Sequence, residues 1–145
     1  MFIFAHLVAG LIVGRISGNY PVSLVGAIFA DLDHLIPYVQ HKVIFNIKKF
    51  WKTITGEQDN IGNQRNYLHN IIVFATLSFL VFIFDFRIGL IFSIAYLSHL
   101  LLDLIDTSDF YPFYPSKMNI KGPIGYFSRA EIYVTLGLFI IFLLI

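Results

Sequence analysis

The sequence predicts an all-α integral membrane protein: a polytopic bundle of about five hydrophobic helices, with one further amphipathic helix at the membrane interface. Of the 145 residues, 57% are apolar and only 13% are charged, and the mean hydropathy is +0.75. Soluble domains contain about 25% charged residues, so this composition cannot supply a water-facing surface. No linker, repeat or low-complexity segment divides the chain, which we interpret as one membrane domain over residues 1–145.

Five apolar runs account for the predicted helices. They cover residues 2–13, 22–30, 71–84, 88–102 and 132–145. A full span needs about 20 apolar residues, which the third and fourth runs reach with their flanks. The first two are short and are separated by a turn signal at residues 15–21, so we expect a tight helical hairpin or a partly inserted pair. Lipid offers no hydrogen-bond partners to the backbone, which favours helices over open strands.

Residues 42–54, between the second and third runs, have the pattern of an amphipathic helix. Its apolar residues, among them Val43, Ile47 and Trp51, recur on one face, and Lys42 and Lys49 lie on the other. This pattern is typical of a helix that lies in the membrane interface, although a helix packed on the protein's own surface would show it too.

Polar side chains inside apolar segments are costly, and each requires a partner or a function. Eight lie in or beside the runs: His6, Asp31, Asp33, His34, His69, His99, Asp103 and Asp106. They occur at the start of the first and third runs and at the end of the second and fourth. If the runs alternate in direction, all eight side chains meet at one membrane face.

The basic residues predict which face this is. Of the ten Lys and Arg residues, Arg15 and Arg87 lie on the side opposite the polar cluster, and the other eight lie on the side of the cluster. The positive-inside rule therefore predicts a cytoplasmic membrane protein whose site faces the cytoplasm. The lysines could instead serve an anionic substrate.

The polar residues have the composition and spacing of a metal site. The chain contains no cysteine, so a transition metal must be held by His nitrogen and carboxylate oxygen. Asp31 and His34 are three residues apart, and His99 and Asp103 are four apart, so each pair shares one face of a helix. Such ligands favour zinc, with manganese or iron as alternatives, and their number allows one or two ions.

Each part also has a simpler explanation. His6 could be a hydrogen-bonded packing residue, and Asp31 could cap a helix. His99 and Asp103 could form a proton relay or a buried hydrogen-bonded pair.

The order of these motifs resembles the YdjM-type inner-membrane metal-dependent hydrolases. That family has an N-terminal His, a D-x-D-H block, an H-R-x-x-T-H-S block, and H-x-x-x-D followed by Thr. The matching residues here are His6, Asp31 to His34, residues 64–70 around Arg65 and His69, and His99 with Asp103 and Thr107. The sequence departs from the family at Gln64, which replaces a His, and at Leu68 and Asn70. The loss at Gln64 could leave one metal or an inactive site.

The family is distantly similar to the zinc-dependent phospholipase C and single-strand nuclease group, which implies phosphoester hydrolysis. We accordingly predict a phosphoesterase that acts at the interface on a lipid, a lipid-linked phosphate or another phosphorylated molecule, with membrane lipids as partners and no nucleic acid. The predicted metal ligands are His6, Asp31, Asp33, His34, His69, His99 and Asp103, and the predicted catalytic residues are Asp31, Asp33, His69 and Arg65. Arg65 is a candidate phosphate clamp or a membrane-edge anchor. The alternatives are a transporter or channel for metal ions or protons, and a catalytically inactive membrane-binding protein.

Overall fold

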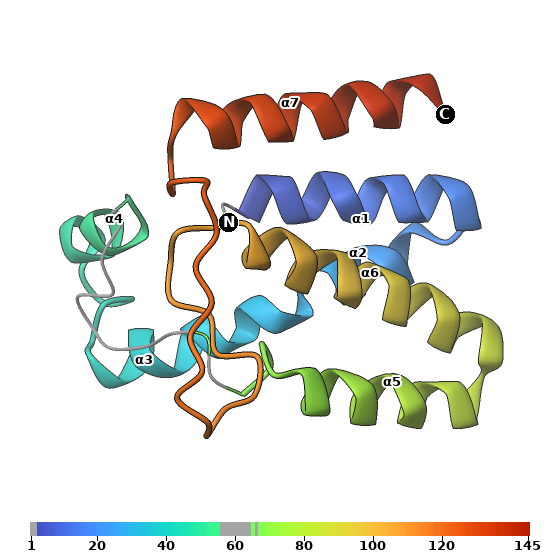
Figure 1. The fold of residues 1–145 in the computed structure, drawn as a ribbon, viewed down its shortest axis with the longest axis horizontal. Coiled ribbons are helices and arrows are strands. Elements are labelled where there is room, and N and C mark those ends of the chain that lie inside the picture. The colour runs from blue at the N-terminus through green and yellow to red at the C-terminus, as the bar shows by residue number, and fades with distance from the viewer. Residues whose placement is uncertain (1–2, 56–64, 66) are drawn as a thin grey trace.

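The computed structural model describes residues 3–55, 65 and 67–145. Its helices are α1 (Ile3–Ser17), α2 (Tyr20–Ile28), the 3-10 helix η1 (Phe29–His34), α3 (Leu35–Gln40), α4 (Ile47–Thr55), α5 (Ile71–Phe84), α6 (Phe86–Leu104) and α7 (Arg129–Leu144). These described residues contain no strand, only two isolated β-bridges. The predicted all-α class is confirmed. Helices α1, α5, α6 and α7 extend in similar directions, and α3, α4 and the long loop after α6 gather at one end (Figure 1).

The first two apolar runs form the predicted helical hairpin. Gly18 adopts a positive φ of 71° just after α1, a conformation that favours glycine and ends the helix. Two glycines of α1, four residues apart, then let α2 approach closely. A Cβ at Gly10 would lie 2.7 Å from Ala27 Cβ, and one at Gly14 would lie 2.6 Å from Ser23 Oγ. Small residues at such crossings are typical of helix pairs in membranes.

The second run continues well beyond its predicted end at residue 30. Helix α2 passes through η1 into α3 without a break in the helical backbone, giving one apolar stretch over Tyr20–Gln40. The polar residues Asp31 to His34 stay helical, with Asp33 directed into the bundle and buried. This stretch and α6 are the two in the described residues that are long and apolar enough to cross a membrane.

The prediction of five membrane-crossing helices is therefore not confirmed. Helices α1, α5 and α7 have 15, 14 and 16 residues, below the roughly 17 that a span needs. Local signals set these lengths: α5 begins at an Asn70 cap and ends where Asp85 starts α6. Asp85 lies at the turn between α5 and α6, and its carboxylate accepts the Ile88 N–H at 2.8 Å.

Helix α6 is the central element, and it contacts α1, α2 and α5. The apolar core lies between α6, the start of η1 and the loop 105–128; its buried members are Ala30, Phe92, Tyr96, Leu100 and Phe110. Residues 110–115, in the loop after α6, are hydrogen-bonded to the start of α5. Pro112 O accepts the Ile71 N–H at 2.8 Å, and Tyr114 O accepts from Asn70 Nδ2 at 2.6 Å.

The predicted amphipathic helix forms, but it starts later than residue 42. Residues 41–46 make turns, in which Lys42 has a positive φ of 54°, and α4 begins at Ile47. Helix α4 lies outside the bundle, beyond α3 (Figure 1).

Candidate metal centre

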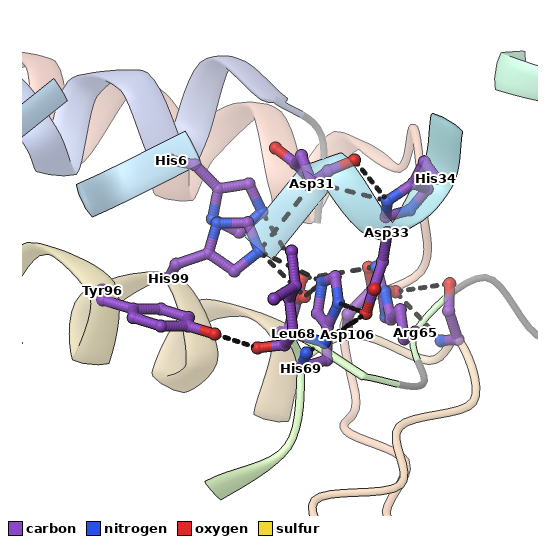
Figure 2. Close-up of polar contacts among 12 residues, drawn as sticks. His6, Asp31, Asp33, His34, Arg65, Leu68, His69, Tyr96, His99 and Asp106 are labelled. Atoms are coloured by element: carbon purple, nitrogen blue, oxygen red, sulfur yellow. Dashed lines mark hydrogen bonds and ion pairs between the residues drawn. The ribbon is translucent and has the colours of Figure 1, made fainter. Parts of the chain in front are cut away.

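The polar side chains of four chain segments meet at one end of the bundle. His6 comes from α1, Asp31 and His34 from η1, His69 from the turn before α5, and His99 and Asp103 from α6. Figure 2 shows the labelled members His6, Asp31, His34, His69 and His99 gathered together, and the His69 and His99 Nε2 atoms both lie close to Asp103 Oδ2. The predicted convergence of these residues is confirmed. It arises because α1 and α5 start at the end of the bundle where η1 and α6 finish.

Three buried side chains form what we term the inner group: His69, His99 and Asp103. His69 Nε2 lies 3.1 Å from Asp103 Oδ2 and 3.3 Å from His99 Nε2. His99 Nε2 lies 3.4 Å from Asp103 Oδ2. The three side chains are at most 1% exposed. Their donor atoms therefore make a nearly equilateral triangle that is closed to solvent.

Further contacts fix the two imidazole rings of the inner group. The Nδ1 atom of His99 lies 2.6 Å from the carbonyl oxygen of Ala27. The Nδ1 atom of His69 lies 3.2 Å from Asp33 Oδ2, and the same oxygen accepts the Leu68 N–H at 2.7 Å. Nδ1 of each ring faces an acceptor, so in the tautomer with its N–H at Nδ1 the lone pair of Nε2 points into the triangle. Metal-binding histidines are oriented in this way.

The second oxygen of Asp103 faces two other groups. Asp103 Oδ1 lies 3.4 Å from His6 Nε2 and 3.3 Å from Arg65 Nη2. The same Arg65 nitrogen donates to Asp106 Oδ2 at 3.1 Å. The His6 ring stacks on the His99 ring, with a centroid distance of 3.8 Å. Asp103 is therefore held from one side by a cation and faces two imidazoles with its other oxygen.

Asp31 and His34 form an outer edge beside the inner group. Their side chains are 25% and 22% exposed, and His34 Nδ1 lies 3.2 Å from the Asp31 carbonyl oxygen. Asp31 Oδ1 lies 3.8 Å from His99 Nε2. Among the described residues, Asp31 Oδ2 is buried without a hydrogen-bond partner. A buried carboxylate oxygen without a donor is costly, which makes it a candidate to bind a cation or accept a proton.

The residues present fit a divalent metal. Six side chains form three overlapping groups whose ligand atoms lie within 4.8 Å of one another: His6, Asp31 and His99; Asp31, His34 and His69; and His69, His99 and Asp103. Zinc bonds to nitrogen and oxygen of about 2.0–2.1 Å place the ligands of a tetrahedron about 3.3–3.4 Å apart. The inner triangle, with sides of 3.1–3.4 Å, matches that spacing.

The electrostatics of His69 agree with such a site. Burial alone would lower the pKa of His69, but hydrogen bonds to Asp103 and Asp33 raise it above its ordinary value. The surrounding carboxylates thus favour a positive charge at this ring. The same field would favour a metal cation.

The other residues singled out in the sequence lie elsewhere or have other contacts. Asp33 lies outside the three ligand groups and contacts His69 instead. Arg65 is 6% exposed and faces two carboxylates, so it is not an exposed anchor at the membrane edge. His41 and Arg129 are exposed. Gln64, where the family motif has His, lies outside the described residues.

Several supporting residues were not predicted as part of the site. Asp106, predicted to join the polar cluster but not to be a metal ligand or a catalytic residue, pairs with Arg65. Tyr96 donates its hydroxyl to the Leu68 carbonyl and so fixes the backbone before His69. Tyr96 lies three residues before His99 in α6, so the two side chains share one face of the helix. This spacing is the sequence signal that could have placed Tyr96 beside the site.

Comparison with known proteins gives one match. No curated protein and no solved structure matches the chain. The family model of the YdjM inner membrane protein matches residues 1–145, the whole chain. The chain therefore belongs to the YdjM inner membrane protein family.

Proposed function

We propose that this protein is a membrane-embedded, metal-dependent hydrolase of a phosphoester, with a lipid or lipid-linked phosphate as its substrate. The observation that carries the proposal is the pairing of a closed triangle of ligand atoms with an open, partly exposed edge. Catalytic metal sites combine fixed protein ligands with an accessible coordination position. A structural site would be closed on all sides.

In this proposal, His69, His99 and Asp103 hold one divalent ion, with zinc favoured by the His and carboxylate donors. His6 shares a separate ligand group with Asp31 and His99. Asp33 orients His69 through Nδ1. The group formed by Asp31, His34 and His69 could take a second ion, so the metal stoichiometry distinguishes a one-ion from a two-ion centre.

The bound metal would acidify a water molecule and polarise a phosphoryl oxygen. Asp31 accepts the proton as the water oxygen attacks phosphorus and the ester P–O bond breaks. Asp31 is suited to this because its side chain is partly exposed at the edge, while its buried Oδ2 atom has no hydrogen-bond donor among the described residues. Arg65, which the sequence predicts to be a phosphate clamp or a membrane-edge anchor, faces Asp103 and Asp106, so in this proposal it balances their charge and holds Asp103 in position.

The location of the centre supports an enzyme over a transporter. The candidate ligands cluster together (Figure 2), on elements that meet at the end of the bundle where α1 begins. At the opposite end, Asp85 caps α6, and Arg87 donates to the Ser17 carbonyl at 3.3 Å. These contacts belong to the helix ends and do not extend the cluster of candidate ligands across the membrane. Without ligands along its path, an ion would have to cross hydrocarbon. We also propose that the centre faces the cytoplasm, because the basic residues lie at its end.

The test combines metal analysis with hydrolysis. Full-length protein, purified without chelator and reconstituted in nanodiscs, is analysed for zinc, manganese and iron and then offered phospholipids and soluble phosphoesters. We expect bound metal, metal-dependent release of phosphate or of a phosphorylated head group, and loss of both in His69→Ala. His41→Ala is the matched control, since it removes an exposed histidine outside the cluster.

Three results would contradict the proposal. Metal content that is equal in both histidine variants would identify the cluster as a hydrogen-bonded relay. Bound metal without hydrolysis of any phosphoester would favour a binding protein, and Gln64→His would then test whether the missing motif residue accounts for inactivity. Metal or proton flux into proteoliposomes, abolished by His69→Ala, would establish the transporter.

A further inference from the structure

Helix α4 exposes an apolar face that the rest of the described chain does not cover. Ile47 and Trp51, one turn apart, are 77% and 65% exposed, and Phe45 in the preceding turn is 76% exposed. The opposite side of α4 is in contact with the protein. Thr53 is buried, and the Phe50 ring meets Tyr38 of α3 edge to face at 5.9 Å.

Lysines lie beside this apolar face. Lys48 and Lys52, also one turn apart, are exposed, and Lys49 donates from Nζ to the His41 carbonyl at 2.7 Å. The sequence from residue 42 to 55 contains four lysines and no acidic residue. A helix with an apolar face and flanking lysines binds best where hydrocarbon and negative charge meet, which is the headgroup layer of an anionic leaflet.

The connection to α3 holds α4 at the depth that contact with the headgroup layer requires. The apolar stretch Tyr20–Gln40 is long enough to cross the membrane, and six residues separate its end from Ile47. The turn between them is closed by hydrogen bonds, with the His41 N–H donating to Pro37 O at 2.9 Å and the Val43 N–H donating to Tyr38 O at 2.8 Å. Helix α4 is therefore fixed close to the level at which the membrane-crossing stretch leaves the bilayer.

We propose that α4 binds anionic phospholipid, with Phe45, Ile47 and Trp51 inserted between headgroups and with Lys48 and Lys52 on the lipid phosphates. We call these five residues the α4 surface. This interaction does not depend on metal binding or hydrolysis. It has a consequence for the metal centre, because Asp31 and His34 belong to the helical stretch to which α4 is tied. Binding of α4 would place their open edge beside the anionic headgroups.

Trp51 provides a direct measurement because it is the only tryptophan in the sequence. The full-length protein is reconstituted into phosphatidylcholine bilayers that contain increasing fractions of phosphatidylglycerol. Trp51 emission, its quenching by aqueous iodide, and its quenching by lipids brominated on the acyl chain near the headgroup are recorded. We expect a blue shift, weaker iodide quenching and stronger bromolipid quenching as the anionic fraction rises.

Charge reversal tests the role of the lysines. In Lys48→Glu with Lys52→Glu, the anionic fraction for half-maximal bromolipid quenching should rise at least about fivefold, since each lysine near an anionic surface contributes about one kcal/mol. Lys48→Arg with Lys52→Arg retains the charge and should behave as the wild type. Lys117→Glu is the control for net charge, because Lys117 is exposed in the loop 105–128. Circular dichroism confirms that each variant is folded.

Two outcomes would overturn the inference. One is Trp51 emission that stays water-like and iodide-accessible at every anionic fraction. The other is shielding from iodide without bromolipid quenching, which would mean that protein, such as a second copy of this chain, covers α4. Equal lipid quenching in the Glu and Arg variants would refute the role of the lysines and leave only apolar insertion.

Discussion

The inner group and the outer edge of the metal centre use the same residue types in opposite surroundings. His69, His99 and Asp103 are at most 1% exposed, and each is held by contacts beyond the triangle. Asp31 and His34 are 25% and 22% exposed, and Asp31 is 3.8 Å from the nearest inner imidazole nitrogen. Burial and fixed geometry suit metal affinity, whereas exposure suits contact with a substrate. The two properties should therefore be separable by mutation.

The largest loss of metal affinity is expected on substitution of Asp103, whose carboxylate joins the inner group to Arg65. Asp103→Asn removes the negative charge and leaves a neutral oxygen facing the triangle. We expect metal affinity to fall by more than about 100-fold, above the 10–100-fold typical of changes outside the ligand shell, together with all metal-dependent turnover. Competition with a fluorescent chelator measures this affinity. Asp109→Asn is the control, because Asp109 is a partly exposed carboxylate that pairs with Lys121 outside the centre. An unchanged affinity in Asp103→Asn would remove Asp103 from the ligand set.

Asp31→Asn should separate turnover from affinity. The substitution removes the proton acceptor at the open edge and leaves the inner triangle intact, so turnover should fall about 10²–10⁴-fold. Metal affinity should change by less than about threefold. Rates at saturating metal, measured beside the chelator assay, test both parts. Loss of one of two bound ions would instead make Asp31 a ligand of a second metal.

A smaller effect is expected at Asp33, which acts on the inner group through His69. Asp33→Asn weakens the acceptor for His69 Nδ1 and leaves the Nε2 atom in the triangle. Metal affinity should fall about 10–100-fold, and turnover at saturating metal should largely recover. A defect that excess metal does not rescue would assign Asp33 a role in the reaction itself.

The smallest effect on the centre is expected at the far end of α6. Asp85→Ala removes the side-chain cap on Ile88 N–H and should lower the free energy of unfolding by about 1 kcal/mol. Metal affinity should not change. A large loss of metal in this variant would mean that the two ends of the bundle are coupled, which would contradict the separation of stability from the site.

Sequence reasoning located the site because polar residues in apolar segments are rare enough to stand out. His6, His99 and Asp103 were visible on these grounds alone, and the alternating direction of the helices indicated that they meet. The partners of Arg65 were not visible, since Asp106 lies 41 residues away and the pairing depends on the loop after α6. The Ala27 carbonyl that orients His99 has no side-chain signature at all.

The lengths of the helices were the weakest part of the sequence interpretation. Hydropathy marks where apolar residues occur, but caps decide where a helix starts and stops. Asn70 starts α5, with its side chain accepting the Ile72 N–H at 2.8 Å. The second helix, by contrast, is longer than expected, because the polar residues Asp31 to His34 suggested that it ends there. Because Asp33 is buried against His69, the helical backbone continues through them.

The short helices have an elastic consequence for the surrounding lipid. At 1.5 Å per residue, α5 with its 14 residues is about 21 Å long and α1 with its 15 residues about 22 Å, whereas the hydrocarbon of a typical bilayer is about 30 Å thick. If α1 and α5 cross the bilayer beside the two longer helices, the acyl chains next to them would have to compress or tilt to avoid leaving apolar tails against polar helix ends. We expect the bilayer to be dimpled around the protein, so that phosphates sink toward the depth of His69. Thinner membranes would accommodate the protein with less deformation.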